Sequence, residues 1–273
     1  MAQGRSSGAI VTFGVLSIAV FAAAAWASHK AWLDLGDPSI ITGYVLLVIM
    51  LSLGFFNVRK RMSMVPLGSA RFWLAFHVAA GLLAIAMFWL HAGLVWPIGL
   101  YERVLTSLFY LVSITGLLGY GISRMLPRRL AQTEIEIIYE RIPAEIAEIR
   151  EKVEALVFEC TEKTGSDTVA KHYIGTLNWF FSRPRFWVSH VVGGDAAGHW
   201  LRGPGVAARR YLNDPEVEYF DQVIELGELK CLIDRHYACQ GLLKKWLLVH
   251  VPLSMAVIIM AVWHFILVNV YSL

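Results

Sequence analysis

Five apolar stretches, each close to the roughly 20 residues that a helix needs to cross a bilayer, constrain this chain more than any other feature. Hydrophobic residues make up 57% of the chain and charged residues 16%, values that exclude an ordinary soluble domain. The sequence therefore predicts an all-α membrane protein in a lipid bilayer. Its five transmembrane helices are expected at Ala9–Trp26, Ile40–Phe56, Phe72–Leu90 with a continuation to Val95, Val104–Ile122 and Trp246–Val270.

Positive charges between these stretches predict the orientation, because Lys and Arg concentrate in short cytoplasmic loops. They lie after spans two and four and before span five, at Arg59, Lys60, Arg61, Arg71, Arg124, Arg128, Arg129, Lys244 and Lys245. The N-terminus is then cytoplasmic and the C-terminus external, in a membrane that we expect to be a bacterial inner membrane. The chain divides into spans one to four (1–122), a soluble and mainly helical insert (123–245), expected in the cytoplasm, and span five (246–273).

Two histidine pairs with the same spacing lie inside spans three and five. His77 and His91 are 14 residues apart, as are His250 and His264. At 3.6 residues per turn, both members of a pair share one helix face, roughly 21 Å apart along the axis. Spans three and five run parallel, so His77 should pair with His250 and His91 with His264. Ionisable residues inside a bilayer are costly and are read as functional.

Four imidazoles at two levels can provide the axial ligands of two haems. Neutral imidazole is a good iron donor. The sequence contains no CxxCH motif, so covalent attachment is excluded and we expect two haems of the b type. Taken singly, a histidine in an apolar helix is more often a structural polar residue. Matching pairs at matching depths favour haem ligation for the set.

Other residues around these pairs are weaker candidates. Cations that could neutralise haem propionates are Arg71 and Lys245 on the inner side and Arg103 on the outer side, although all three also have a topogenic role. Polar residues at the outer face that could handle quinol protons are Asp34, Asp37, Tyr101 and Glu102. The sequence leaves open whether a quinone site exists.

The insert is expected to be largely helical. Thr133–Tyr139 and Ala144–Glu159 show apolar residues at helical spacing, separated by Pro143, and the stripe of the second segment comprises Ile146, Ile149, Val153, Leu156 and Val157. The glycine-rich segment Val192–Gly205 predicts a loop at the membrane surface. A further helix should begin near Asp214-Pro215. Cys231, His236 and Cys239 match no standard zinc spacing.

The histidine quartet resembles the transmembrane di-haem core of ferric reductases and NADPH oxidases. Its 14-residue spacing is also similar to that of cytochrome b of quinol–cytochrome c oxidoreductases. The five spans are similar to quinol-linked anchors such as the gamma subunit of respiratory nitrate reductase. These resemblances cover about half of the chain and imply bis-histidine haem at the four positions, with electron transfer across the membrane. The chain departs from ferric reductases in one respect: we expect no flavin and nicotinamide domain after span five.

Three functions remain open at this point. The first is the membrane subunit of a respiratory or photosynthetic redox complex, linked to a quinone pool or to a redox protein. An iron–sulfur, flavin or c-type cytochrome subunit would then dock on the insert or the outer face. The second is a ferric or other metal reductase core with a separate flavin subunit. The third is a receptor or transporter with structural histidines. The net charge of +3 gives no reason to expect nucleic acid as a partner.

Overall fold

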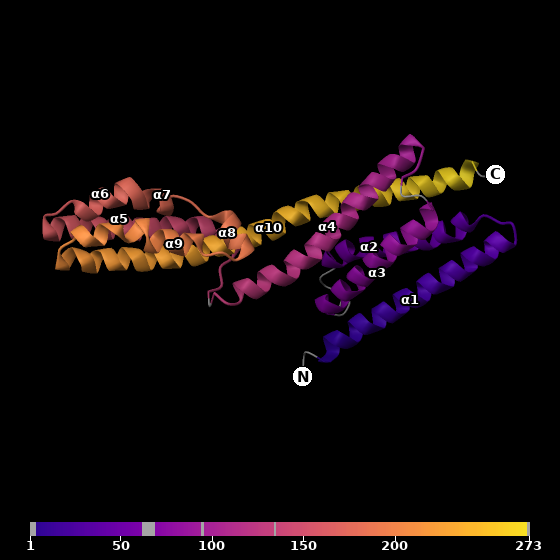
Figure 1. The fold of residues 1–273 in the computed structure, drawn as a ribbon, viewed down its shortest axis with the longest axis horizontal. Coiled ribbons are helices and arrows are strands. Elements are labelled where there is room, and N and C mark those ends of the chain that lie inside the picture. Colours follow the sequence, from indigo (N-terminus) through magenta and orange to yellow (C-terminus); the bar gives the residue numbers. More distant parts are fainter. Residues whose placement is uncertain (1–3, 62–68, 94–95, 134, 272–273) are drawn as a thin grey trace. The chain divides into compact units, whose positions relative to one another are not determined.

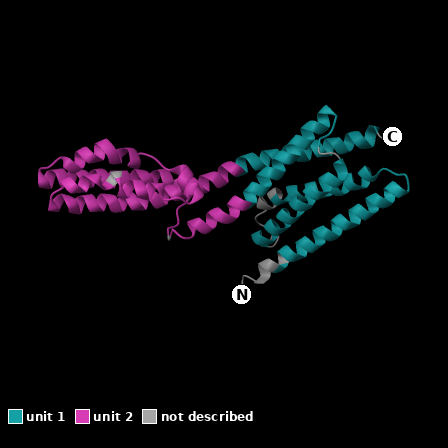
Figure 2. Ribbon diagram, in the orientation of Figure 1, with its two compact units in different colours: residues 1–120, 247–273 teal, residues 121–246 magenta. Residues whose placement is uncertain are grey.

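The computed structural model describes residues 4–61, 69–93, 96–133 and 135–271, and every regular element in these ranges is helical (Figure 1). The chain divides into two compact units (Figure 2). Unit 1 comprises residues 1–120 and 247–273, and unit 2 comprises residues 121–246. The two longest helices, α4 (Leu100–Leu130) and α10 (Asp214–Tyr271), contribute residues to both units.

Unit 1 contains the apolar helices. It is built from α1 (Gly4–Leu33), α2 (Pro38–Arg61), α3 (Ala70–Ala92), the first part of α4 and the last part of α10. Within the described residues, five helices are long and apolar enough to cross a membrane, as expected from the sequence. Helices α4 and α10 extend well beyond the predicted spans. Hydropathy detects only the apolar part of a helix, and both helices continue through charged residues.

Helix α3 has well-defined ends. Ser69 is its N-cap and accepts a hydrogen bond from the backbone N–H of Phe72. Gly93 follows Ala92 with φ 61°, a left-handed conformation that glycine adopts without strain and that commonly ends helices. The predicted helical continuation beyond Leu90 therefore stops at Ala92. Leu94 and Val95 lie outside the described residues.

The core of unit 1 lies among α1, α2 and α3, with contributions from α4 and α10. The backbones of α1, α2 and α3 pack closely against one another. Phe88 of α3 stacks on Phe109 of α4, with ring centroids 4.3 Å apart. The buried residues are Ala24, Leu46, Ile49, Met50, Ala80, Leu83, Ala84, Met87, Phe88, Phe109 and Val257. All of those on α3 fall between His77 and His91, so this core separates the levels of the two histidine pairs.

Unit 2 is a helical domain organised around α5 (Ile142–Thr164) and residues 214–246 of α10. The predicted stripe of α5 is confirmed, because Ile146, Ile149, Val153 and Val157 are buried and Leu156 packs partly against them. The remaining helices are α6 (Thr168–His172), a π-helical turn (Tyr173–Leu177), α7 (Asn178–Phe181), α8 (Trp187–Val192), α9 (Ala196–Arg202) and a 3-10 helix (Pro204–Tyr211).

Two expectations for unit 2 are wrong. The segment Thr133–Tyr139 is not a helix. Its residues 135–138 have no regular structure and lead into a short 3-10 helix at Tyr139–Arg141, and Pro143 lies in the first turn of α5. The glycine-rich segment 192–205 is not a continuous loop either, because it contains α9. Leu201 of α9 is buried, and Trp200 stacks on Phe180 with ring centroids 5.2 Å apart. Packing onto the core of unit 2 outweighs the local effect of the glycines.

Candidate functional site

The structure brings the four histidines of the sequence pattern together as two pairs within unit 1. The ring centroids of His77 and His250 are 6.5 Å apart, with an interplanar angle of 79°. Those of His91 and His264 are also 6.5 Å apart, with an angle of 80°. Each pair joins α3 to α10 in the same order along the chain, so these parts of the two helices run parallel. Two nearly identical ring arrangements thus occur one above the other.

The helices that carry the pairs meet through side chains. The Cα atoms of α3 and α10 stay more than 8 Å apart at nearly every position. All four imidazoles are half-buried. The space between the two backbones is therefore bridged by side chains, the four imidazoles among them.

The separation of the rings fits two ligands on opposite sides of one metal ion. Imidazole nitrogens bind metals at about 2.0–2.1 Å, which together with the size of the ring puts the centroids of two opposed ligands roughly 6.4 Å apart. Both pairs are within about 0.1 Å of that value. The residues present at each level therefore fit a haem iron with two axial imidazoles.

A carbonyl group fixes the tautomer of His91. Its Nδ1 lies 3.0 Å from the carbonyl oxygen of Ser39 and 3.3 Å from Oγ1 of Thr42. The Thr42 hydroxyl donates to backbone carbonyls of its own helix, α2. A carbonyl oxygen only accepts, so Nδ1 of His91 carries the proton and donates it. This leaves the lone pair of Nε2 available to a metal, the arrangement typical of ligand histidines.

The same logic applies to His250 on α10. Its Nδ1 lies 3.0 Å from Oγ1 of Thr115 on α4. The Thr115 hydroxyl donates to the carbonyl of Val112, at 3.0 Å. Since that proton is used, Thr115 accepts from Nδ1–H of His250, and Nε2 again keeps its lone pair. One histidine in each pair is therefore oriented by a partner on α2 or α4.

Aromatic rings position the other two histidines. The ring of Tyr101 stacks nearly parallel to His264, with centroids 6.1 Å apart, and its hydroxyl donates to the carbonyl of Met260 at 2.5 Å. The ring of Phe56 lies 5.0 Å from that of His77. Tyr101 was expected at the outer face as a proton-handling residue. The structure places its ring against an imidazole of the site.

Two glycines make room for the imidazoles. A Cβ atom at Gly43 of α2 would lie 2.9 Å from Cε1 of His91, which is closer than real Cβ contacts. A Cβ atom at Gly116 of α4 would lie 3.4 Å from Cε1 of His250. Sequence reasoning missed Gly43, Ser39 and Thr115, because their role depends on how α2 and α4 are rotated toward the histidines.

The cations expected near haem propionates have other surroundings. The Lys245 ammonium lies 5.5 Å from the ring centroid of Trp187, inside unit 2. Arg103 donates from Nε to the carbonyl of Pro97 at 3.1 Å. Arg71 is exposed in the first turn of α3. Among the described contacts of these three residues, none is with a histidine of either pair.

The three acidic candidates expected at the outer face have different surroundings. Asp37 accepts a hydrogen bond from the backbone N–H of Ser39 at 2.8 Å and so caps the start of α2. Glu102 folds back over Gly99, where a Cβ atom would collide with the carboxylate. Asp34 is exposed in the turn after α1. Asp37 thus has a structural role, and Glu102 lies beside Tyr101 in the first turn of α4.

The polar residues of unit 2 form a structural network. His236 is bonded at both ring nitrogens, to Oγ1 of Thr133 at 2.8 Å and to Gln240 at 3.2 Å. Cys239 points its thiol at the carbonyl of His190. Across the described ranges, no group of three or more His, Cys, Asp or Glu side chains is arranged to hold a metal ion.

No protein-family model, curated protein or solved structure matches this chain.

Proposed function

We propose that unit 1 binds two b-type haems, one between His77 and His250 and one between His91 and His264, and conducts electrons across the membrane. The single observation that carries this proposal is the repeated geometry of the pairs, 6.5 Å between ring centroids at nearly perpendicular angles. The Nδ1 hydrogen bonds of His91 and His250 support it, because with the proton on Nδ1 the lone pair of each ring is on Nε2. When bound, the haems supply one-electron iron chemistry.

The chain itself would hold the two haems apart in a dry layer. Ala84 and Val257 lie seven residues after His77 and His250, on the same helix faces, and are only 3% and 2% exposed. The two ligand levels are separated by roughly 21 Å along the helix axis. The apolar core between the two levels would then set the distance over which electrons move.

We further propose that this chain is the membrane subunit of a respiratory or photosynthetic redox complex in a bacterial inner membrane. The concentration of Lys and Arg after spans two and four supports an orientation with the N-terminus inside. The pair His77/His250 would then lie toward the cytoplasm and His91/His264 toward the outside. Electrons would be exchanged with a quinone pool or with a partner redox protein.

Paired substitutions test the haem assignment. His91→Ala and His264→Ala should each halve the haem content of the purified protein, and the double variant should lose no more, because both ligands serve one site. His91→Ala combined with His250→Ala should lose both haems. His29→Ala, on α1 beside Trp32, is the control and should keep both. If His91→Ala with His264→Ala removed all haem while leaving the protein folded, the proposed pairing would be wrong.

A further inference from the structure

Helix α8 of unit 2 has one apolar side that is left uncovered. Val188 and Val192 are four residues apart, so they share a helix face, and they are 67% and 64% exposed. His190, on the opposite side of the helix, is buried. Exposed aliphatic residues are common on proteins, so this pair gains its significance from where α8 lies.

Cations from α4 and α10 hold both ends of α8. Arg129 of α4 donates to the carbonyl of Val191, and a Cβ atom at Gly193 would lie 3.0 Å from its Cζ. The Lys245 ammonium of α10 lies 5.5 Å from the ring centroid of Trp187. Helix α8 therefore lies at the end of unit 2 from which α10 continues into its apolar part (Figure 1).

The sequence positions of these two cations indicate the level of the lipid head groups. Lys245 directly precedes the predicted span Trp246–Val270, and Arg129 follows Ile122 by seven residues, about 10 Å of helix. The head-group layer adds about 5–8 Å on each side of the hydrocarbon, and an Arg side chain can extend back toward it. An element held between Arg129 and Lys245 is thus expected at the bilayer surface, where Trp is enriched.

A buried ion pair fixes the residues that lead into α8. Phe186 precedes the helix with φ 54°, a left-handed conformation that residues other than glycine rarely adopt. Asp234 accepts a hydrogen bond from the backbone N–H of Arg185, and Lys230 donates to the carbonyl of Arg183 at 2.9 Å. Lys230 and Asp234 are themselves fully buried and bonded to each other. The position of α8 is therefore set by the core of unit 2.

We propose that α8 is an interfacial helix, with Val188 and Val192 inserted at the surface of the bilayer and Arg129 and Lys245 bound to the phosphates of anionic phospholipids. Interfacial helices combine an apolar side with flanking cations in this way. The inference goes beyond the proposed function and does not depend on haem. A partner protein fits less well, because two valines offer far less than the roughly 800 Å² that each partner of a stable complex buries.

Fluorescence quenching by brominated lipids tests the contact. The full chain with Val188→Cys is labelled with a thiol-reactive fluorophore and placed in vesicles of phosphatidylcholine and phosphatidylglycerol, one of them brominated on its acyl chains. Val192→Cys is a second labelling position on the same face. The unsubstituted chain measures any labelling of the three native cysteines.

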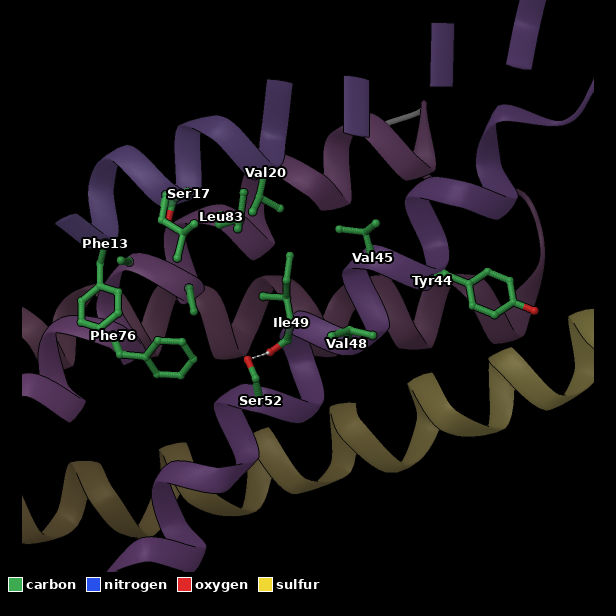
Figure 3. A pocket seen from close by; sticks show the side chains of 13 residues that line it. Phe13, Ser17, Val20, Tyr44, Val45, Val48, Ile49, Ser52, Phe76 and Leu83 are labelled. Atoms are coloured by element: carbon green, nitrogen blue, oxygen red, sulfur yellow. Dashed lines mark hydrogen bonds between the residues drawn. The ribbon is translucent and has the colours of Figure 1, made fainter. Parts of the chain in front are cut away.

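Two further positions provide controls for water and for lipid. Phe158→Cys of α5 is similarly exposed, and its neighbour Glu159 is bonded to Tyr219, 27 residues or about 40 Å of helix before Trp246. Val48→Cys of α2 lies within a span, on the wall of an apolar pocket among α1, α2 and α3 (Figure 3). None of the described residues lining that pocket is Lys or Arg.

We expect brominated lipid to quench the labels at positions 188, 192 and 48, but not the label at 158. At 188, brominated phosphatidylglycerol should quench more strongly than brominated phosphatidylcholine at equal mole fraction, whereas at 48 the two should be equivalent. Lys245→Gln should lower the preference for phosphatidylglycerol about fivefold, the effect of one cation at an anionic surface. Lys171→Gln, in the exposed pair with Asp167, should leave it unchanged.

Labels at 188 and 192 that are quenched no more than the label at 158 would overturn the assignment, as they would if another protein covered α8. Equal quenching by the two brominated lipids at 188 would overturn the binding of anionic lipid. Haem is measured in the same vesicles. Its absence would count against the proposed function and leave the result for α8 standing.

Discussion

Hydrogen-bond acceptors at Nδ1 orient two of the four imidazoles, those of His91 and His250. The Nδ1 of His250 bonds the hydroxyl of Thr115, whereas that of His91 has a backbone carbonyl and a hydroxyl within reach. Hydrogen bonds of this kind orient ligand histidines and raise their basicity. The two levels should therefore respond differently to side-chain substitutions.

Thr115→Val, which keeps the shape and removes the acceptor, should weaken haem binding between His77 and His250 by about tenfold. Thr115→Ser keeps the hydroxyl and should bind as wild type. The measurement is a haem titration of the apo-protein followed by its absorption spectrum. Identical titrations for the Val and Ser variants would show that Thr115 does not orient a ligand.

The glycines give a second prediction at this scale. Gly43→Ala should remove the haem between His91 and His264, because its Cβ would lie 2.9 Å from the imidazole. Gly116→Ala meets His250 at 3.4 Å and should keep most haem. Gly14→Ala, with open space around it, is the control. Haem per chain in the three variants is the measurement, and an intact content in Gly43→Ala would contradict the geometry.

His190 makes unit 2 sensitive to acid. It is 2% exposed, neither ring nitrogen has a hydrogen-bond partner in the described structure, and burial lowers its pKa from 6.5 to about 4. The unfolded chain therefore binds this proton first, and stability falls as pH drops below 6.5. Between pH 6.5 and 5 the wild type should lose about 2 kcal/mol more than His190→Leu. Equal pH profiles in chemical unfolding would rule this out.

At the scale of elements, periodicity predicted α5 correctly and failed just before it. Ile146, Ile149 and Val153 recur at helical spacing and are buried. In the preceding segment, Ile135 and Ile137 pack against the core, while Ile138 between them and α5 is 64% exposed. This alternation has a period of two, which is typical of an extended chain, so the helix predicted for this segment is wrong. The spacing of apolar residues identifies a helix only where it is repeated over several helical turns.

Helix α10 contains a buried ion pair that its sequence does not reveal. Lys230 and Asp234 are four residues apart, fully buried, and 2.6 Å from each other. The Lys230 ammonium also donates to the carbonyl of Arg183 at 2.9 Å. Four-residue spacing of opposite charges normally indicates an exposed pair, as at Asp167 and Lys171. Only the tertiary packing of unit 2 distinguishes the two cases.

Lys230→Met should destabilise unit 2 by about 3–5 kcal/mol, because Asp234 would remain buried without its cation. The double variant Lys230→Met/Asp234→Leu should be less destabilised than the single one. Lys171→Met, in the exposed pair, should change stability by less than about 1 kcal/mol. The free energy of chemical unfolding of each full-length variant is the measurement. Similar losses for Lys230→Met and Lys171→Met would contradict the buried pair.

At the scale of the whole molecule, the sequence predicted an all-helical chain with five apolar helices, and the structure agrees. It also predicted which histidines share a helix face, since that follows from the 14-residue spacing alone. Ser39, Gly43 and Thr115 could not be found this way, because α2 and α4 offer no periodic signal for the residue that faces an imidazole. The tautomers likewise depend on packing between helices.

The central claim is tested most directly by the number of haems per chain. We would purify the wild-type protein and measure haem by the pyridine haemochrome reaction, together with a reduced-minus-oxidised spectrum. The account predicts two b-type haems per polypeptide, each with the low-spin spectrum of an iron with two imidazole ligands. A folded protein that takes up no haem would contradict it, and the four histidines would then be structural or transport residues.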